Sequence, residues 1–468
     1  MFKAPGVKGK QFAVLGLGRT GQATCHALKR GGADVLPWDE AEHSRESARK
    51  QNIELVDLSR ERVWEENRIS RLVVSPGIPH LYPEPHPIIR MAHNRGIPVD
   101  NDIGLFFHFH EHFKQSKPEG EIPKIVAVTG TNGKSTTAAL INHVLQSHGY
   151  KSAVAGNIGI AVLGLENLEQ LTHIILEVSS YQSEAASRLN PDVAIFLNLD
   201  EDHLDRHQGM GGYFAAKRRL FDGANLELAV IGVDEPEGEF LGNNIVSRGQ
   251  GTRLATITND KTKKIPHYGM IGSDKTLTEF SDGKAIGTYS MGKNPNLLGN
   301  HNLQNAAAAF FACCHLNVPA KNVIDYFNLF DGLPHRSQVV AKKNGVIYIN
   351  DSKATNVKST TRALASHQRI HWIAGGLAKD GGVKTLGKSL NNVIHAYFFG
   401  YSAKSFALEL GQVPHSVFPN LPEAIRAASA NAKAGDTVLL APAAASFDQY
   451  RDFEERGFHF ISEVNKIT

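Results

Sequence analysis

The chain has 468 residues, of which 41% are hydrophobic and 21% are charged. These proportions are ordinary for a soluble globular enzyme, and they exclude a disordered chain. The formal net charge of +3 is small and spread along the sequence, so nothing points to a nucleic-acid binder or a lipid-surface binder.

The length predicts roughly three domains, since a domain averages about 150 residues. The three cysteines, Cys25, Cys313 and Cys314, form no CxxC pair, and their odd number suits a reducing compartment better than a disulfide framework. Glycines interrupt the apolar run near the N-terminus, and no stretch approaches the ~20 apolar residues of a membrane span. We therefore expect a cytoplasmic protein without membrane insertion.

The first predicted strand, residues 11–15, leads into the glycine turn Gly16–Gly21, which has the spacing G-x-G-x-x-G. With Asp39 about 20 residues further on, this pattern is typical of a dinucleotide site and leaves an NAD(P)-dependent oxidoreductase as an alternative. The same geometry holds any diphosphate at a helix N-terminus, including that of a UDP-sugar. A second turn, residues 75–79, follows the predicted strand 71–74 and should face the same crevice.

Two breaks divide the chain. Residues 114–121 are polar and contain Pro and Gly, which predicts a linker, and a second break falls at residues 332–334. We place the boundaries at about residues 115 and 332. Residues 234–292, rich in Gly, Asp, Lys and Thr, are predicted to form a β-rich excursion of the middle domain.

A second strand, residues 125–128, precedes the loop Gly130–Thr136, and apolar residues at helical spacing follow. Glycines let backbone amides turn toward phosphate oxygens, Lys134 neutralises charge, and the Ser135 hydroxyl suits Mg²⁺. The pattern GxxxxGK[ST] is incomplete, because Val128 stands where the first glycine is expected. The context still predicts ATP binding.

Acidic residues follow the next two strands. Glu177 closes the apolar run 172–176, where a carboxylate is well placed to complete a Mg²⁺ shell of oxygens. Residues 198–207 contain four acids and two histidines, which fits either a metal site or an ordinary acidic surface turn. Lys217 lies in a basic helical stretch and, taken alone, is typical of a solvated side chain. A third glycine-ended strand spans residues 371–374.

Taken together, these motifs resemble the Mur ligases, and within them the branch that adds D-glutamate. The resemblance rests on the loop 130–136, the G-x-H-N-x-x-N-A element at 299–306, Leu333–Arg336, and the segments DSKATN at 351–356 and APAAASFDQY at 441–450. The last two distinguish this branch from its sister ligases and from folylpolyglutamate synthase. The matches run in order from residue 16 to residue 457.

The resemblance implies an α/β fold of three domains. These are a Rossmann-like UDP-binding domain (1–115), a central P-loop ATPase-type domain (116–332) and a Rossmann-like C-terminal domain that binds the amino acid (333–468). It also implies the reaction: ATP phosphorylates the carboxylate of UDP-MurNAc-L-Ala, and D-glutamate attacks the acyl phosphate. ATP and two Mg²⁺ ions are the implied cofactors. We expect a monomer whose partners are these small molecules only.

The resemblance also assigns residues. Lys134, Glu177, His203 and Lys217 would be catalytic, with Lys217 carbamylated by CO₂. Metal ligands would be Ser135, Glu177, His203 and Lys217. ATP would contact Gly130, Thr131, Asn132, Gly133, Lys134, Ser135, Thr136, Asn302, Asn305, Arg336 and Asp351. The UDP-substrate would contact Arg19, Thr20, Ser75, Gly77, Asn157 and His203. D-Glutamate would contact Lys353, Thr355, Lys379, Ser446 and Phe453.

Two positions depart from the family pattern. The acid expected near the basic residue after Gly376 has moved past Lys379 to Asp380, and Asp39-Glu40 differs from the Thr/Arg that some members place near uracil. A nucleotide-binding protein that has lost catalysis is a further alternative. It is disfavoured because Lys134, Glu177, His203 and Lys217 occur together.

Overall fold

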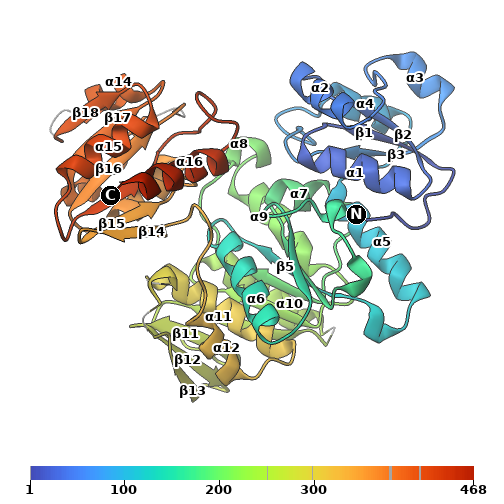
Figure 1. Ribbon diagram of the computed structural model, residues 1–468. Helices are drawn as coiled ribbons and strands as arrows, with labels where there is room; N and C mark the ends of the chain where they lie inside the picture. Colours follow the sequence, from blue (N-terminus) through green and yellow to red (C-terminus); the bar gives the residue numbers. More distant parts are fainter. Residues whose placement is uncertain are drawn as a thin grey trace. The chain divides into compact units, whose positions relative to one another are not determined.

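A computed structural model describes residues 2–249, 251–292, 294–297, 299–378, 382–410 and 413–467. The chain divides into two compact units, residues 1–330 and 331–468. The described residues form three sheets, two in the first unit and one in the second (Figure 1). No helix among them is long and apolar enough to cross a bilayer.

The first sheet has four parallel strands in the order β2-β1-β3-β4. Its strands are β1 (Gln11–Leu15), β2 (Asp34–Trp38), β3 (Ile69–Val74) and β4 (Val99–Asp100), and its helices are α1 (Arg19–Arg30), α2 (Glu42–Lys50), α3 (Glu61–Glu66), α4 (Pro87–Asn94) and α5 (Asp102–Ser116). The chain leaves β1 toward β2 on one side and reaches β3 on the other. Such a switch point places the crevice at the carboxyl end of β1.

The second sheet has nine strands in the order β13-β12-β11-β10-β9-β8-β5-β7-β6. From β6 to β11 neighbouring strands are parallel, and β12 and β13 are antiparallel additions at one edge. The strands are β5 (Lys124–Thr129), β6 (Ser152–Gly156), β7 (His173–Glu177), β8 (Val193–Phe196), β9 (Leu228–Gly232), β10 (Arg253–Thr258), β11 (Tyr268–Ser273), β12 (Thr276–Ser281) and β13 (Lys284–Ser290). The helices are α6 (Lys134–Ser147), α7 (Ser180–Ala185), α8 (Leu204–His207), α9 (Met210–Arg218), α10 (Pro236–Arg248), α11 (Asn300–His315) and α12 (Ala320–Phe327).

The central strands are apolar throughout because helices cover both faces of a parallel sheet. In β5 and β8, Val126, Val128 and Ile195 are fully buried and pack against α6 and α11 in one core, while Ala127 and Phe196 face a second core. Burial of this strand pair fixes the carboxyl end of β5. The loop that follows β5 is therefore held on a rigid support.

The third sheet, in the second unit, has the order β14-β15-β19-β16-β17-β18, parallel except for β14. Its strands are β14 (Gln338–Lys343), β15 (Val346–Asn350), β16 (Ile370–Gly375), β17 (Val393–Phe399), β18 (His415–Phe418) and β19 (Thr437–Leu440), and its helices are α13 (Val357–Ala365), α14 (Ala403–Glu409), α15 (Leu421–Asn431) and α16 (Phe453–Lys466).

Two sequence predictions differ from the structure. The predicted linker at 114–121 is helical up to Ser116, because α5 runs two residues past Lys114. The predicted β-rich excursion at 234–292 begins with a helix, α10, and its strands β10 to β13 continue the central sheet. The glycines and aspartates there make tight turns between strands of that sheet.

Candidate active site

The loop between β5 and α6 has the backbone of a phosphate-binding loop. Gly130 and Gly133 have φ of +145° and +84°, a region that favours glycine, and Gly133 is the N-cap of α6. A Cβ at Gly133 would lie 2.1 Å from Oδ1 of the buried Asn305. The amide of Asn132 donates to Oδ1 of Asn198 at 2.9 Å, which fixes the loop against the end of β8.

We expect Gly133→Ala to lower the melting temperature more than Gly149→Ala. Gly149, just beyond the other end of α6, has φ of +93° but no atom within 4 Å of the added Cβ. Both changes impose backbone strain of about 1–2 kcal/mol. Only the change at Gly133 must also displace the Asn305 side chain. Equal melting temperatures for the two variants would contradict this close packing.

Two lysines converge on one carbonyl oxygen. Nζ of Lys134 donates to the carbonyls of Gly130 and Thr131, both at 2.8 Å, and Nζ of Lys217 donates to the same Gly130 carbonyl at 2.7 Å. Lys217 is only 1% exposed, and its Nζ lies 4.4 Å from the centre of the Tyr213 ring. The interpretation of Lys217, from its own stretch of sequence alone, as a solvated side chain is therefore wrong.

Burial, and then the charge of Lys134, hold the pKa of the Lys217 ammonium well below its usual range, while Asp202 and Glu177 act in the opposite direction. A lowered pKa raises the fraction of neutral amine, which is the form that reacts with electrophiles. The Tyr213 hydroxyl lies 3.2 Å from Oγ1 of Thr131, and burial raises the pKa of Tyr213 to about 12. Tyr213 thus contacts Lys217 through its ring and Thr131 of the loop after β5 through its hydroxyl.

Glu177 ends β7 beside this loop and is 2% exposed. Its Oε1 accepts a hydrogen bond from Nδ2 of Asn157 at 3.0 Å, while its Oε2 is buried without a partner. A buried carboxylate oxygen without a partner is costly unless a cation or donor reaches it. In the part of the chain that is described, no three His, Cys, Asp or Glu side chains gather as a metal site by themselves.

The two histidines of the acidic segment 198–207 have different environments. His203 is the N-cap of α8, is exposed, and packs against the Tyr181 ring with centroids 4.9 Å apart. His207 is buried and hydrogen-bonds to Ser180 at 2.9 Å and to Glu184 at 3.2 Å, a packing role.

Helix α11 supplies the other wall of the loop. Nδ2 of Asn305 donates to Oδ1 of Asn302 at 3.1 Å, and Gln304 accepts from Nδ2 of Asn198 at 3.2 Å. Ser135 and Thr136 are in the first turn of α6, with Ser135 buried. The structure therefore brings together the predicted loop residues, Glu177, Lys217, Asn157, Asn302 and Asn305 in the first unit.

The predicted UDP-substrate residues of the first sheet line one cavity of ≈ 590 Å³. Arg19, Thr20, Ser75 and Gly77 are among its walls. Oγ of Ser75 donates to the carbonyl of Gly16 at 2.9 Å, so the two turns are joined. Both carboxylate oxygens of Asp39 accept backbone amides, from Leu17 at 2.6 Å and from Ala41 at 2.8 Å. Asp39 therefore shapes the glycine turn.

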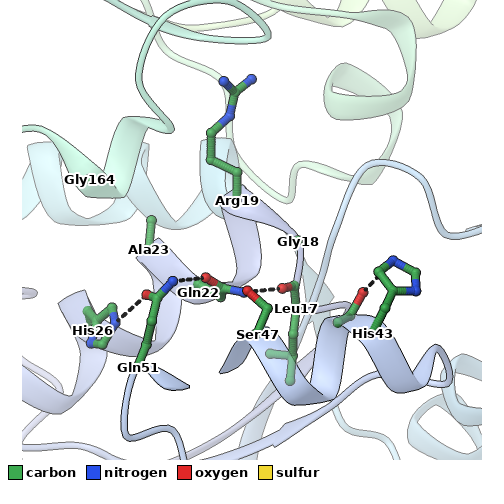
Figure 2. Close-up of a pocket in the computed structure, with 11 residues that line it drawn as sticks. Leu17, Gly18, Arg19, Gln22, Ala23, His26, His43, Ser47, Gln51 and Gly164 are labelled. Carbon is green, nitrogen blue, oxygen red and sulfur yellow. Dashed lines mark hydrogen bonds between the residues drawn. The ribbon is translucent and has the colours of Figure 1, made fainter. Parts of the chain in front are cut away.

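A second cavity, of ≈ 520 Å³, adjoins the first and shares Gly18, Arg19 and Ser44 with it. Figure 2 shows a row of hydrogen bonds among its lining residues, from His26 through Gln51 and Gln22 to the carbonyl of Leu17. His26 and Gln22 belong to α1 and Gln51 is the C-cap residue of α2, so the row ties both helices to the glycine turn.

In the second unit, Lys353 and Thr355 follow β15, Ser446 follows β19, and Phe453 is the first residue of α16. Nζ of Lys353 lies 3.9 Å from the centre of the Phe453 ring, and Ser446 is 2% exposed. The Thr355 amide donates to the Lys353 carbonyl at 2.8 Å. Burial raises the pKa of Asp351 to about 6, against the opposing effects of the Ser337 amide and the Arg336 charge. Lys379 lies outside the described residues.

Sequence reasoning missed Tyr213 and Asn198. Tyr213 stands four residues before Lys217 on α9, so helical spacing alone could have indicated it. Asn198 follows strand β8 in the chain, but its bond to Asn132 spans 66 residues and leaves no local pattern.

The sequence of this chain is similar to the sequences of known proteins. The Mur ligase middle domain matches residues 128–313, and the Mur ligase glutamate ligase domain matches residues 335–444. The UDP-N-acetylmuramoylalanine–D-glutamate ligase of Cereibacter sphaeroides is 46% identical over 467 residues, with 100% of both chains covered. This chain belongs to the Mur ligase family. A relative of the same name from Dinoroseobacter shibae is 47% identical over 470 residues, again with 100% of both chains covered.

Solved structures share the Mur ligase fold. The UDP-N-acetylmuramate–alanine ligase MurC of Thermotoga maritima superposes with a TM-score of 0.60 at 18% identity, covering 97% of this chain and 99% of that one. FolC of E. coli in complex with ADP gives a TM-score of 0.53 at 20% identity, covering 73% and 89%. The predicted α/β fold class is confirmed. Membership of the Mur ligases also sets aside the oxidoreductase interpretation of the first glycine turn.

Proposed function

We propose that this chain is an ATP-dependent ligase that joins D-glutamate to UDP-N-acetylmuramoyl-L-alanine in peptidoglycan precursor synthesis. The full-length identity of 46% to a ligase named for this reaction carries the proposal. The loop geometry around Gly130, with two lysines and a buried carboxylate, supports it, because such a site suits phosphoryl transfer.

The reaction has two balanced steps. A carboxylate oxygen of the UDP-substrate attacks the γ-phosphorus of ATP, and the bond to the ADP oxygen breaks. The neutral amine of D-glutamate then attacks the acyl carbon, the bond to phosphate breaks, and the nitrogen loses a proton. Activation is needed because a carboxylate oxygen is a poor leaving group, and forming the acyl phosphate splits one difficult step into two.

Residues of the first unit would bind different parts of ATP. The amides of Gly130 to Gly133 and the N-terminus of α6 would surround the phosphates, and Lys134 would neutralise their charge. Asn302 and Asn305 would contact the nucleotide from α11. In the second unit, Arg336 and Asp351 would position phosphate and ribose.

The donor set fits magnesium. The unpartnered Oε2 of Glu177, the buried Ser135 hydroxyl and His203 are suitable ligands. Lys217 as an ammonium would repel a cation. As a neutral amine it would attack CO₂, lose a proton and become an anionic carbamate that can bind one. Bound Mg²⁺, which we expect as two ions, would supply positive charge to the phosphate oxygens.

The two other substrates would occupy separate loops. The UDP diphosphate would bind the glycine turn at the N-terminus of α1, with Arg19, Thr20, Ser75 and Gly77 around it, and Asn157 and His203 would contact the muramoyl part. The carboxylates of D-glutamate would bind Lys353, Thr355, Lys379 and Ser446, beside Phe453. We further propose domain boundaries near residues 115 and 332, a monomer, and a location in the cytoplasm.

The direct test supplies purified protein with UDP-MurNAc-L-Ala, ATP and Mg²⁺, and adds D-glutamate or L-glutamate. We expect phosphate release with D-glutamate only, and none after chelation of the metal. The amide product is identified by mass spectrometry. Phosphate release that is equal for both enantiomers, or that needs neither, would overturn the proposed substrate.

A further inference from the structure

The second unit contains a guanidinium in its interior. Arg456, in the first turn of α16, is 0% exposed. Its Nε donates to Oγ of Ser352 at 3.0 Å, and its Nη2 donates to the Ser352 carbonyl at 2.9 Å. Its Nη1 donates to the carbonyls of Ala444 at 3.1 Å and Gly375 at 3.3 Å.

These acceptors come from the ends of three neighbouring strands. Ser352 follows β15, Gly375 ends β16, and Ala444 follows β19, and β15, β19 and β16 are adjacent in the sheet. The residues proposed for the amino acid lie on the same loops or beside them: Lys353, Thr355, Ser446 and Phe453. One side chain thus fixes the spacing of the loops at this edge.

A second contact ties the start of α16 to the same point. Oγ of Ser352 accepts from Arg456 and donates to the carbonyl of Phe453 at 2.8 Å. Phe453 in turn packs under Nζ of Lys353. Movement of Arg456 would therefore shift Phe453 and Lys353 together.

Arg456 also brings charge that other side chains do not neutralise. Among the described residues, no carboxylate lies within ion-pair distance of its guanidinium. Burial lowers the pKa of Arg456 to about 10, with Asp448 acting in the opposite direction, so the group stays charged at neutral pH. A buried cation held only by carbonyls and one hydroxyl favours an anion nearby.

We propose that Arg456 is the positioning residue of the amino-acid site, setting the distance between the loops that grip the two carboxylates of the incoming amino acid and adding positive charge behind them. This inference rests on the proposed function. It assigns Arg456 no direct contact with the substrate.

The test uses the full chain with three variants. Arg456→Lys keeps the charge but removes the fork of donors, and Ser352→Ala removes a single acceptor of that fork. Arg451→Gln removes the charge of an exposed arginine five residues earlier, whose side chain is 83% exposed. Phosphate release is measured against D-glutamate concentration and, separately, against UDP-substrate concentration, and melting temperatures are recorded.

We expect KM for D-glutamate to rise roughly tenfold or more for Arg456→Lys, and by a smaller factor for Ser352→Ala, since each lost bond to a charged group weakens the loop arrangement. KM for the UDP-substrate should stay within about twofold, and Arg451→Gln should match the wild type. A purely structural role would lower kcat and melting temperature with an unchanged KM, because fewer folded molecules alter only the active amount.

An unchanged KM for D-glutamate in both Arg456→Lys and Ser352→Ala overturns the inference and leaves the proposed function intact. If the wild type uses another amino acid, the proposed substrate fails, and the same KM comparison is made with that amino acid. Wild-type phosphate release that needs no amino acid overturns both.

Discussion

Lys134→Ala is expected to reduce phosphate release by about 10²–10³-fold, the usual cost of removing one donor that stabilises developing charge. Lys134 is the first residue of α6, and its Nζ donates to the carbonyls of Gly130 and Thr131 in the loop. Without this ammonium, the charge of the transferred phosphoryl group loses a fixed counter-charge. Affinity for the UDP-substrate should not change, because its proposed turn belongs to the four-stranded sheet.

The measurement is phosphate release under saturating substrates, together with calorimetric titration by Mg·ATP and by UDP-MurNAc-L-Ala. Lys151→Ala is the matched control, since Lys151 is exposed and lies beyond the far end of the same helix. The control should retain wild-type values. Full turnover by Lys134→Ala would show that the loop after β5 is not the phosphate site.

Lys217→Ala should lose about 100-fold in activity, the upper end of the usual cost of removing a group that supports a metal site, because we propose Lys217 as part of such a site. Part of that activity should return with added acetate. Alanine leaves space where the buried side chain stood, and a short carboxylate there can replace the carbamate. The lowered pKa of Lys217 supports carbamate formation because only the neutral amine attacks CO₂.

Activity is measured over a series of acetate, propionate and chloride concentrations, with the melting temperature as a check on folding. Lys217→Arg serves as the comparison: it keeps a cation, cannot form the carbamate and leaves no space, so acetate should not rescue it. A carbon-13 signal from labelled bicarbonate should appear in the wild type and not in Lys217→Ala. Equal responses to acetate and chloride would count against carbamylation.

Local sequence patterns predicted the buried strands that lead into glycine turns. The apolar runs at 11–15, 125–128 and 371–374 lie within β1, β5 and β16, because a strand buried on both faces must be apolar throughout and must end in a turn that glycine permits. The start of α10 within 234–292 was missed, since its Gly and Asn content resembles that of a loop.

These local patterns did not predict contacts between residues that are far apart in the sequence. Nζ of Lys217 meets the Gly130 carbonyl across 87 residues of chain, and Nε of Arg456 meets Ser352 across 104 residues. Neither residue differs, in its local sequence, from a solvated helix cation. Their burial follows from how strands pair and helices pack, which single-residue propensities do not encode. For Lys217 the family resemblance supplied what the spacing could not.

The hairpin turns at the antiparallel edge of the central sheet can accept inserted residues. Strands β12 and β13 are joined by Asp282-Gly283, and β11 and β12 by Asp274-Lys275. All four residues have positive φ, as type I′ hairpin turns require. Strand β5, which leads into the phosphate loop, is separated from β12 by β8, β9, β10 and β11. A tag or a fluorescent label inserted at Asp282-Gly283 would therefore lie four strands away from β5 and should leave the loop after β5 undisturbed.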